Sequence, residues 1–201
     1  MKMRRIVLLI AAAACLAVGC SRSQKFTVQG TLKDIKFAKA DTLRLESDQL
    51  EKPILAVVND KDFVIKGKVK NPAIGKIFSN SARRKSQFLI LEKGTISFKD
   101  GYACGTPLND STVAFTERVK ALAHKYPNPE DRELKKEAIE KEFATFVSNH
   151  KDDPCATYAI LLAKNRIEPK MILKLIDSAS PKIQKDGDVD AMKKILTMSV
   201  K

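Results

Sequence analysis

Apolar and polar residues alternate along the first half of the chain, which is the period of β-strands. In the stretch 25–32, Phe26, Val28 and Gly30 fall on one side and polar residues on the other. Later stretches repeat this alternation or form short apolar runs between turn residues. The pattern predicts strands over residues 25–32, 41–45, 53–58, 62–69, 73–78, 88–91 and 95–98.

Short strands joined by polar turns are typical of an antiparallel β-sandwich or an open barrel. The connection at 80–86 carries Arg83, Arg84 and Lys85, and we interpret it as a basic loop. We therefore expect a β-sandwich or open barrel over residues 25–108.

The hydrophobic period changes to that of helices after Asn109. Asn109 or Asp110 is expected to cap the first helix. Proline residues mark the starts of later helices near 129, 154, 169 and 181, and a last amphipathic segment covers 189–200. The fold class is therefore α+β, with a helical region over 109–201. The first helical stripe consists of Phe115, Val119, Leu122 and Tyr126.

Residues 1–19 have the three-part layout of an export signal. Their apolar run, 6–18, is shorter than the roughly 20 residues of a transmembrane helix. The ending Leu16-Ala17-Val18-Gly19-Cys20 resembles the lipobox of bacterial lipoproteins, whose signal peptide is cut before the cysteine. We expect lipid on Cys20 and a tether over 20–24. The alternative is a soluble export signal cut nearby, with Cys20 a bystander.

Lipid on Cys20 predicts attachment to a membrane of the cell envelope. The next residue is Ser21 and not Asp, the usual inner-membrane retention signal, so we expect the outer membrane. The tether lacks the acidic residues of surface-exported lipoproteins. We therefore expect the protein to face the periplasm.

The full chain has 37 basic and 24 acidic residues, a net charge of +13. Removing Lys2, Arg4 and Arg5 with the signal lowers this charge to +10, and +7 of it lies in residues 20–110. The excess can attract an anionic surface such as lipid headgroups. It can also be a lysine-rich edge that prevents aggregation, which we favour. With no Trp and no aromatic-basic interleaving, nucleic acid is not an expected partner.

Two cysteines remain once Cys15 leaves with the signal and Cys20 is lipidated. Cys104 and Cys155 would then lie in an oxidising compartment. Three interpretations stay open: a structural disulfide, two inert thiols, or a redox pair. A helix start at Asp153-Pro154 can lower the pKa of the Cys155 thiol, whereas Asp153 itself works the other way. Cys-x-x-Cys does not occur in the chain.

No motif of a catalytic or cofactor site stands out in the sequence. The chain has two His residues, His124 and His150, and neither has the spacing of a zinc site with Cys104 or Cys155. Gly-x-Ser-x-Gly, His-Glu-x-x-His and a phosphate-binding Gly loop do not occur. We therefore predict no catalytic residue, no metal and no cofactor.

Four motif pieces stand out: Phe26-x-x-x-Gly30, Phe63-x-x-x-Gly67, Phe88-x-x-Leu91-Glu92-x-Gly94-x-Ile96 and Gly105-Thr106-x-Leu108-Asn109. Taken together they resemble the domain of unknown function at the N-terminus of lipid-anchored thiol–disulfide interchange proteins of Gram-negative bacteria. The resemblance covers about residues 25–195. Those proteins continue into a thioredoxin-like domain with Trp-Cys-x-x-Cys, which this chain does not contain, so no catalytic residue can be carried over.

These observations predict a non-enzymatic lipoprotein that presents a surface to an envelope protein partner. The last helix, 189–200, either forms that surface or simply closes the helical bundle. A first alternative is an accessory role in thiol–disulfide exchange, in which Cys104 or Cys155 exchanges with a separate thioredoxin-like partner. A second alternative is a sandwich that binds a small apolar ligand or glycan.

Overall fold

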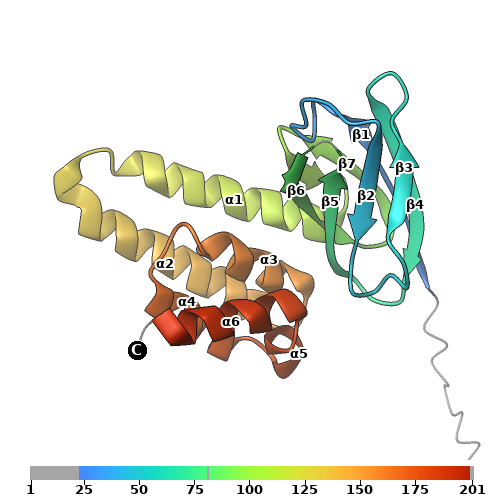
Figure 1. Ribbon diagram of the computed structural model, residues 1–201. Coiled ribbons are helices and arrows are strands. Elements are labelled where there is room, and N and C mark those ends of the chain that lie inside the picture. Colours follow the sequence, from blue (N-terminus) through green and yellow to red (C-terminus); the bar gives the residue numbers. More distant parts are fainter. Residues whose placement is uncertain (1–22, 81, 200–201) are drawn as a thin grey trace, which may run out of the picture.

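The computed structural model describes residues 23–80 and 82–199 (Figure 1). The expected signal peptide and Cys20 lie outside these residues, so both stay predictions. In the described part the strands are β1 (Gln24–Thr31), β2 (Thr42–Glu46), β3 (Ile54–Val57), β4 (Asp62–Val69), β5 (Ala73–Ser79), β6 (Ala82–Leu91), β7 (Gly94–Lys99) and β8 (Tyr102–Cys104). The helices are α1 (Pro107–Lys125), η1 (Pro129–Asp131), α2 (Arg132–Asn149), α3 (Pro154–Ala163), α4 (Pro169–Ser178), α5 (Pro181–Gln184) and α6 (Gly187–Ser199).

The strands form two four-stranded sheets, in the orders β4-β1-β7-β8 and β3-β2-β5-β6. Their apolar faces enclose one core, in which Phe26 and Val28 of β1 pack with Leu43 and Leu45 of β2. The alternation read from the sequence thus marks the residues that face this core. We call the two sheets the β half and the helices after it the helical half.

The purely antiparallel sheet predicted from the sequence is wrong in one place. β1 and β7 pair in parallel, with Val28 opposite Ile96, whereas β4 and β8 pair antiparallel on either side of them. A parallel pair needs a long crossover connection, and here the chain from β2 to β6 supplies it. The two sheets also remain separate and do not close into a barrel.

Two phenylalanine–glycine pieces of the sequence interlock across β1 and β4. Phe26 lies opposite Gly67, and Phe63 lies opposite Gly30. A Cβ atom on Gly67 would lie 2.4 Å from the Phe26 ring, a distance that no real Cβ atom tolerates. Each ring therefore covers the glycine of the other strand, which fixes the register of this pair.

Three local predictions are corrected by the structure. The basic loop at 80–86 is wrong, because β6 already begins at Ala82 and pairs with β5 through a register shift at Phe78/Ser79. The short strand β8 was not predicted. The first helix begins at Pro107 with Thr106 in the N-cap position, so neither Asn109 nor Asp110 is its cap.

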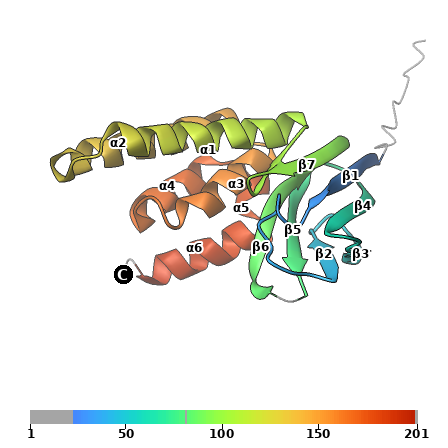
Figure 2. The same ribbon diagram turned by 90° about the horizontal axis from the view of Figure 1, so that it is seen from above.

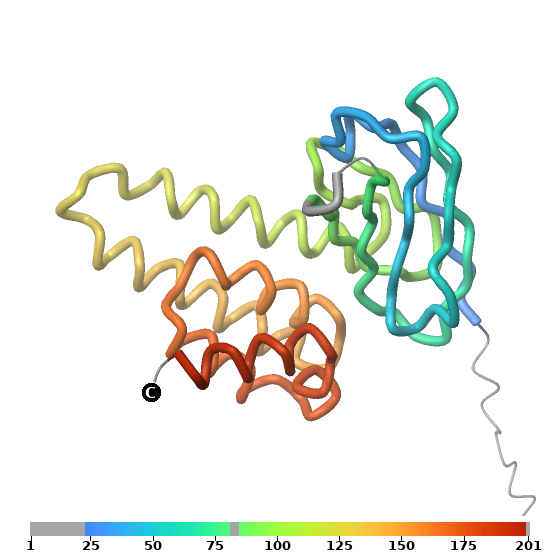
Figure 3. The backbone as a smooth tube through the Cα atoms, in the orientation of Figure 1, coloured from blue at the N-terminus to red at the C-terminus, as the bar shows by residue number. Residues whose placement is uncertain are grey.

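The helical half packs on the β6 and β8 side of the β half, with α3 against β5 and β6 and α1 against β6 and β8 (Figures 1 and 2). Phe115, Phe143 and Phe146 from α1 and α2 stack at its centre, and Ile74 and Ile90 from β5 and β6 join the same core. The starts predicted at Pro154, Pro169 and Pro181 are confirmed. The tube in Figure 3 shows α1 and α2 as a long hairpin that extends away from the sheets. No helix in the described ranges is long and apolar enough to span a bilayer.

A buried polar network joins the two halves where β6 ends and α1 begins. The Glu92 carboxylate accepts the backbone N–H groups of Leu108 at 2.8 Å and Asn109 at 3.2 Å, so the residue directly after β6 caps the helix. The Asn109 amide in turn accepts the N–H of Ile90 at 2.9 Å and donates to its carbonyl at 2.8 Å. Asn109 therefore acts as a short piece of neighbouring strand for the free edge of β6.

The turn before α1 depends on a glycine. Gly105 has φ +91°, and a Cβ atom there would lie 3.0 Å from the Thr95 carbonyl oxygen. The Gly105 N–H donates to the Asp110 carboxylate at 2.8 Å, while the Thr106 hydroxyl accepts from Asn109 at 2.8 Å. The Leu-Glu-x-Gly and Gly-Thr-x-Leu-Asn pieces are thus two sides of one junction, which we call the Glu92–Asn109 junction.

Replacing Asn109 by Ala should lower the free energy of unfolding by about 3 kcal/mol. The change leaves the buried N–H and carbonyl of Ile90 without partners, at about 1–3 kcal/mol for each group. Urea unfolding followed by circular dichroism measures the effect. Asn128→Ala is the matched control, because its exposed side chain makes one 3.3 Å bond, and a change within about 0.5 kcal/mol is expected there. Equal effects of the two substitutions would contradict the role of the junction.

Candidate functional site: a groove between the two halves

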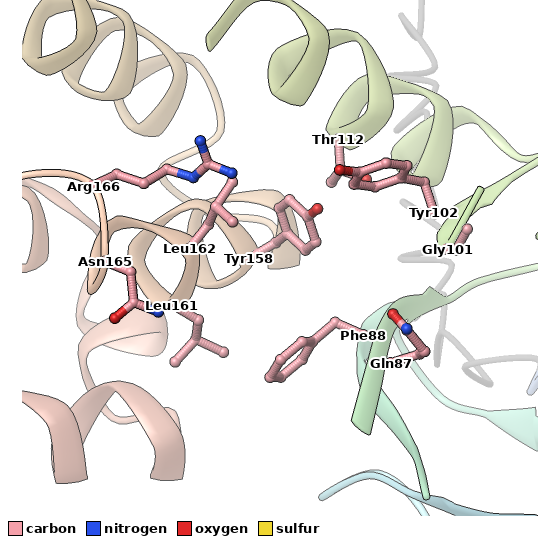
Figure 4. A pocket seen from close by; sticks show the side chains of 11 residues that line it. Gln87, Phe88, Gly101, Tyr102, Thr112, Tyr158, Leu161, Leu162, Asn165 and Arg166 are labelled. Carbon is pink, nitrogen blue, oxygen red and sulfur yellow. The ribbon is translucent and has the colours of Figure 1, made fainter. Parts of the chain in front are cut away.

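A groove of about 410 Å³ lies where the helical half meets the β half. Such a volume is in the range of small-molecule and side-chain binding sites. Figure 4 shows α3 and the turn after it on one wall, with β6 and the 101–103 segment on the other. The lining residues are Gln87, Phe88, Gly101, Tyr102, Ala103, Thr112, Tyr158, Leu161, Leu162, Asn165 and Arg166.

The walls of the groove are mostly aromatic and aliphatic. Phe88 and Tyr102 come from the β half, and Tyr158, Leu161 and Leu162 come from successive turns of α3. These side chains are half-buried, so they pack against the core below and still present apolar surface to the cavity. The groove can therefore hold an apolar group of a ligand or of a partner protein.

Hydrogen bonds hold the polar groups around the groove. The Gln87 amide donates to the Ile35 carbonyl at 2.9 Å, and the Tyr158 hydroxyl lies 3.3 Å from that of Thr116. Burial raises the pKa of the Tyr158 phenol above its usual value, which keeps it protonated at neutral pH. These bonds hold Gln87 on the β6 wall and Tyr158 on the α3 wall in place.

Positive charge lines the rim of the groove. Arg166 is exposed at its mouth, and within the described ranges no carboxylate lies within ion-pair distance of it. The Lys120 ammonium lies 4.4 Å from the centroid of the Tyr102 ring, but it pairs with the Glu117 carboxylate at 2.7 Å, so Arg166 carries the unbalanced charge. The eleven lining residues include neither Asp nor Glu. An apolar group that carries a negative charge would fit this surface best.

The last helix, α6, closes the helical bundle, and its role as a partner surface stays a prediction. Val189 is fully buried, and Met192 and Leu196 pack against the helical core. Ile195 and Met198, by contrast, are 58% and 72% exposed. The helix therefore closes the bundle with one side and leaves a small apolar strip on the other.

A second constellation surrounds His150, at the connection between α2 and α3. The Ser111 hydroxyl lies 3.2 Å from Nε2 of His150, and Nδ1 lies 2.8 Å from the Asp153 carboxylate. The other Asp153 oxygen accepts the Cys155 N–H at 2.8 Å, which caps α3. Sequence reasoning missed this group, although His150-x-x-Asp153-x-Cys155 falls within six residues of a helix–turn–helix connection.

The Ser111–His150–Asp153 chain has the order of a hydrolase triad, but the donors that an oxyanion needs are already bonded. At the start of α1, Leu108 and Asn109 donate to Glu92 and Asp110 donates to Thr106. At the start of α3, the first two amide groups both donate to Asp153. The arrangement thus ties the α2–α3 connection to α1 and offers no prepared site for a tetrahedral intermediate.

Ligand atoms of His150, Asp153 and Cys155 lie within 4.8 Å of one another, so these are the residues that could converge on a metal ion. A zinc ion would need the Cys155 thiolate. Burial first, and then Asp153, raise the pKa of this thiol far above its usual value. The thiol instead donates to the Leu108 carbonyl at 3.5 Å. The His150 ring and the Cys155 thiol thus each have a protein partner, Asp153 and the Leu108 carbonyl.

Cys104 and Cys155 are both free thiols in the structure. Cys104 lies on β8 and is partly exposed, whereas Cys155 is 0% exposed inside the helical core. Burial and Asp110 raise the pKa of the Cys104 thiol, and Lys99 lowers it to a lesser extent. The helix start at Asp153 therefore does not activate Cys155, and neither cysteine has the depressed pKa of a redox-active thiol.

Comparisons of the chain with models of protein families, with curated proteins and with solved structures give no match. Function is therefore inferred from the residues and their geometry.

A thiol reagent should label Cys104 more slowly than free cysteine at pH 7 and should label Cys155 only after unfolding. A raised pKa leaves a smaller thiolate fraction at neutral pH, so the rate at Cys104 should increase as the pH rises toward the thiol pKa. The chain from Ser21 onward has only these two cysteines, so absorbance of the released chromophore counts them. In Cys155→Ala, unfolding with denaturant should expose no second reactive thiol. Fast labelling of Cys155 in the folded protein would contradict its burial.

Proposed function

We propose that this protein is a lipid-anchored periplasmic binding module, held at the outer membrane by Cys20, that binds an envelope partner protein in the groove between its two halves. The observation that carries the proposal is the groove itself, which combines an apolar wall, a lining without carboxylates and Arg166, whose guanidinium has no ion-pair partner among the described residues. The β half supports one wall of the groove. It is a sandwich whose strands pair antiparallel, except for the parallel β1–β7 pair.

The partner surface is expected to be an apolar segment that carries an acidic group. The aromatic and leucine side chains of the groove would bury the apolar part, which is the main source of affinity in such sites. Arg166 would pair with the acidic group at the rim and fix its orientation. A purely apolar ligand would leave Arg166 unused.

The proposed module binds its partner and catalyses no reaction. The lack of a catalytic step is supported by the bonded amides around Ser111 and His150, and by the raised thiol pKa values of Cys104 and Cys155. An accessory role in thiol–disulfide exchange would have to use Cys104, the partly exposed thiol. Its raised pKa makes this alternative the weaker one.

Replacing Cys20 by Ser should release the processed protein from the membrane fraction. The physical reason is that acyl chains on this residue supply the binding to the bilayer. Fractionation of cells and mass spectrometry of the mature N-terminus measure the effect. Cys15→Ser is the control, because this residue lies within the expected signal peptide and should leave the lipid in place. Retention of a processed Cys20 variant in membranes washed at high salt, which removes electrostatic binding, would contradict the anchor.

A photo-crosslinking residue at Leu161 should capture a protein partner in whole cells, whereas the same residue at Leu134 should not. Leu161 lines the groove, and Leu134 is an apolar side chain on α2, 55% exposed and away from it. Adding Arg166→Glu to the Leu161 variant should weaken capture about tenfold, which corresponds to about 1.4 kcal/mol.

The charge reversal needs its own control. Arg132→Glu changes an exposed arginine at the start of α2 and should leave capture at Leu161 unchanged. Identical adducts from Leu161 and Leu134, or equal losses in the two arginine variants, would contradict recognition in the groove.

A further inference from the structure

A row of lysines crosses the outward face of the sheet β4-β1-β7-β8 at the end where β1 begins. Lys25 on β1 lies directly opposite Lys68 on β4. Lys93 continues this line, because its backbone N–H donates to the Gln24 side chain at 3.2 Å, at the start of the same strand. All three lysine side chains are exposed. We call Lys25, Lys68 and Lys93 the lysine row.

The positive charge of the lysine row is not balanced within the β half. In the parts of the chain that the structure describes, no carboxylate lies within ion-pair distance of any of the three ammonium groups. Asp62 supplies the one carboxylate at an outward position of these four strands, and it lies opposite Thr31 at the far end of the sheet. Lys66, two residues before Lys68 on the same face of β4, adds a fourth exposed positive charge.

Protection of a sheet edge does not explain this arrangement. Such protection needs lysines on the edge strand, which is β4. Lys25 lies on β1, an inner strand, where its side chain faces Lys68 directly. Like charges in directly opposed positions destabilise a strand pair. The pair is therefore better explained by an external anionic surface that lies against both ammonium groups.

We propose that the lysine row docks on the anionic headgroups of the membrane that carries the lipid anchor. The proposal rests on the proposed anchor at Cys20. The four steps from Cys20 to Gln24 span at most about 14 Å when fully extended. Figures 1 and 2 show that β1 enters on the side opposite to the C-terminal helices. The anchor thus brings this end of the sheet to the bilayer surface before any other part of the fold.

The test uses the chain from Ser21 onward, which lacks Cys20 and so reports binding by the protein surface alone. Both hydrophobic cores consist of residues from Phe26 onward, so this chain contains the complete described fold. Cosedimentation with vesicles of phosphatidylcholine plus phosphatidylglycerol should show binding at low salt and its loss at high salt. Vesicles of phosphatidylcholine alone should not bind.

Lys25→Glu, Lys68→Glu and Lys93→Glu together should weaken binding to the anionic vesicles at least about 100-fold, since each lysine near such a surface contributes roughly a fivefold factor. The single change Lys68→Glu separates binding from stability. It places a carboxylate opposite Lys25, so the melting temperature should stay the same or rise while vesicle binding falls.

A charge-matched control changes three exposed lysines of the helical half to Glu: Lys141, Lys164 and Lys174. This control should lose much less binding than the triple variant of the row. Equal losses would show that net charge alone attracts the protein and would overturn the proposal. Vesicle binding that is unchanged by the three substitutions in the lysine row would also overturn it. The lipid on Cys20 is measured in a separate experiment. If Cys20 carries no lipid but the chain from Ser21 onward still binds vesicles through the lysine row, the anchor is refuted and the proposal for the lysine row stands.

Discussion

The Glu92–Asn109 junction is the contact on which the rest of the structure depends. Glu92, directly after β6, caps the first helix, and Asn109 of that helix completes the hydrogen bonding of the strand. Both groups are almost fully buried, so each would be costly if the other were missing. The junction therefore couples the direction of α1 to the end of β6 and makes the two halves one unit. The Lys76–Asp188 ion pair adds a second link, from β5 to the start of α6.

The groove is a consequence of that coupling. One of its walls belongs to β6 and the 101–103 segment, and the other belongs to α3, which packs on α1 and α2. No single element shapes it, so its form is only as fixed as the angle between the halves. The Ser111–His150–Asp153 chain and the Cys155 thiol fix the position of the α3 wall relative to α1, because they connect the α2–α3 corner to the first turns of α1. We therefore interpret these reactive residue types as structural in this fold.

The sequence predicted most of the elements but not the contacts between them. Alternation and helical stripes found the strands through β7 and the proline-led helices, because burial on one face leaves a local period. The strand at 82–87 was missed because Arg83, Arg84 and Lys85 look like a loop, although β5 alone determines the pairing there. The capping prediction failed at Asn109 because the real cap, Glu92, comes from seventeen residues earlier in the chain. Ser111 and His150 meet across 39 residues, which no spacing rule connects.

Sheet order separates the proposed anchor from the proposed binding site. In one sheet β4 and β1 lie at one side and β8 at the other, and in the second sheet β6 lies at the same side as β8. Lys25, Lys68 and the start of β1 therefore occupy one side of the β half, while Phe88 and Tyr102 of the groove occupy the opposite side. A protein held to a membrane by the first side would expose the groove to the periplasm. The lysine row and the lipid would hold the same end of the sheet, one through electrostatic contacts and the other through hydrophobic ones. Together with the short tether, these two contacts would limit tilting of the folded protein relative to the membrane.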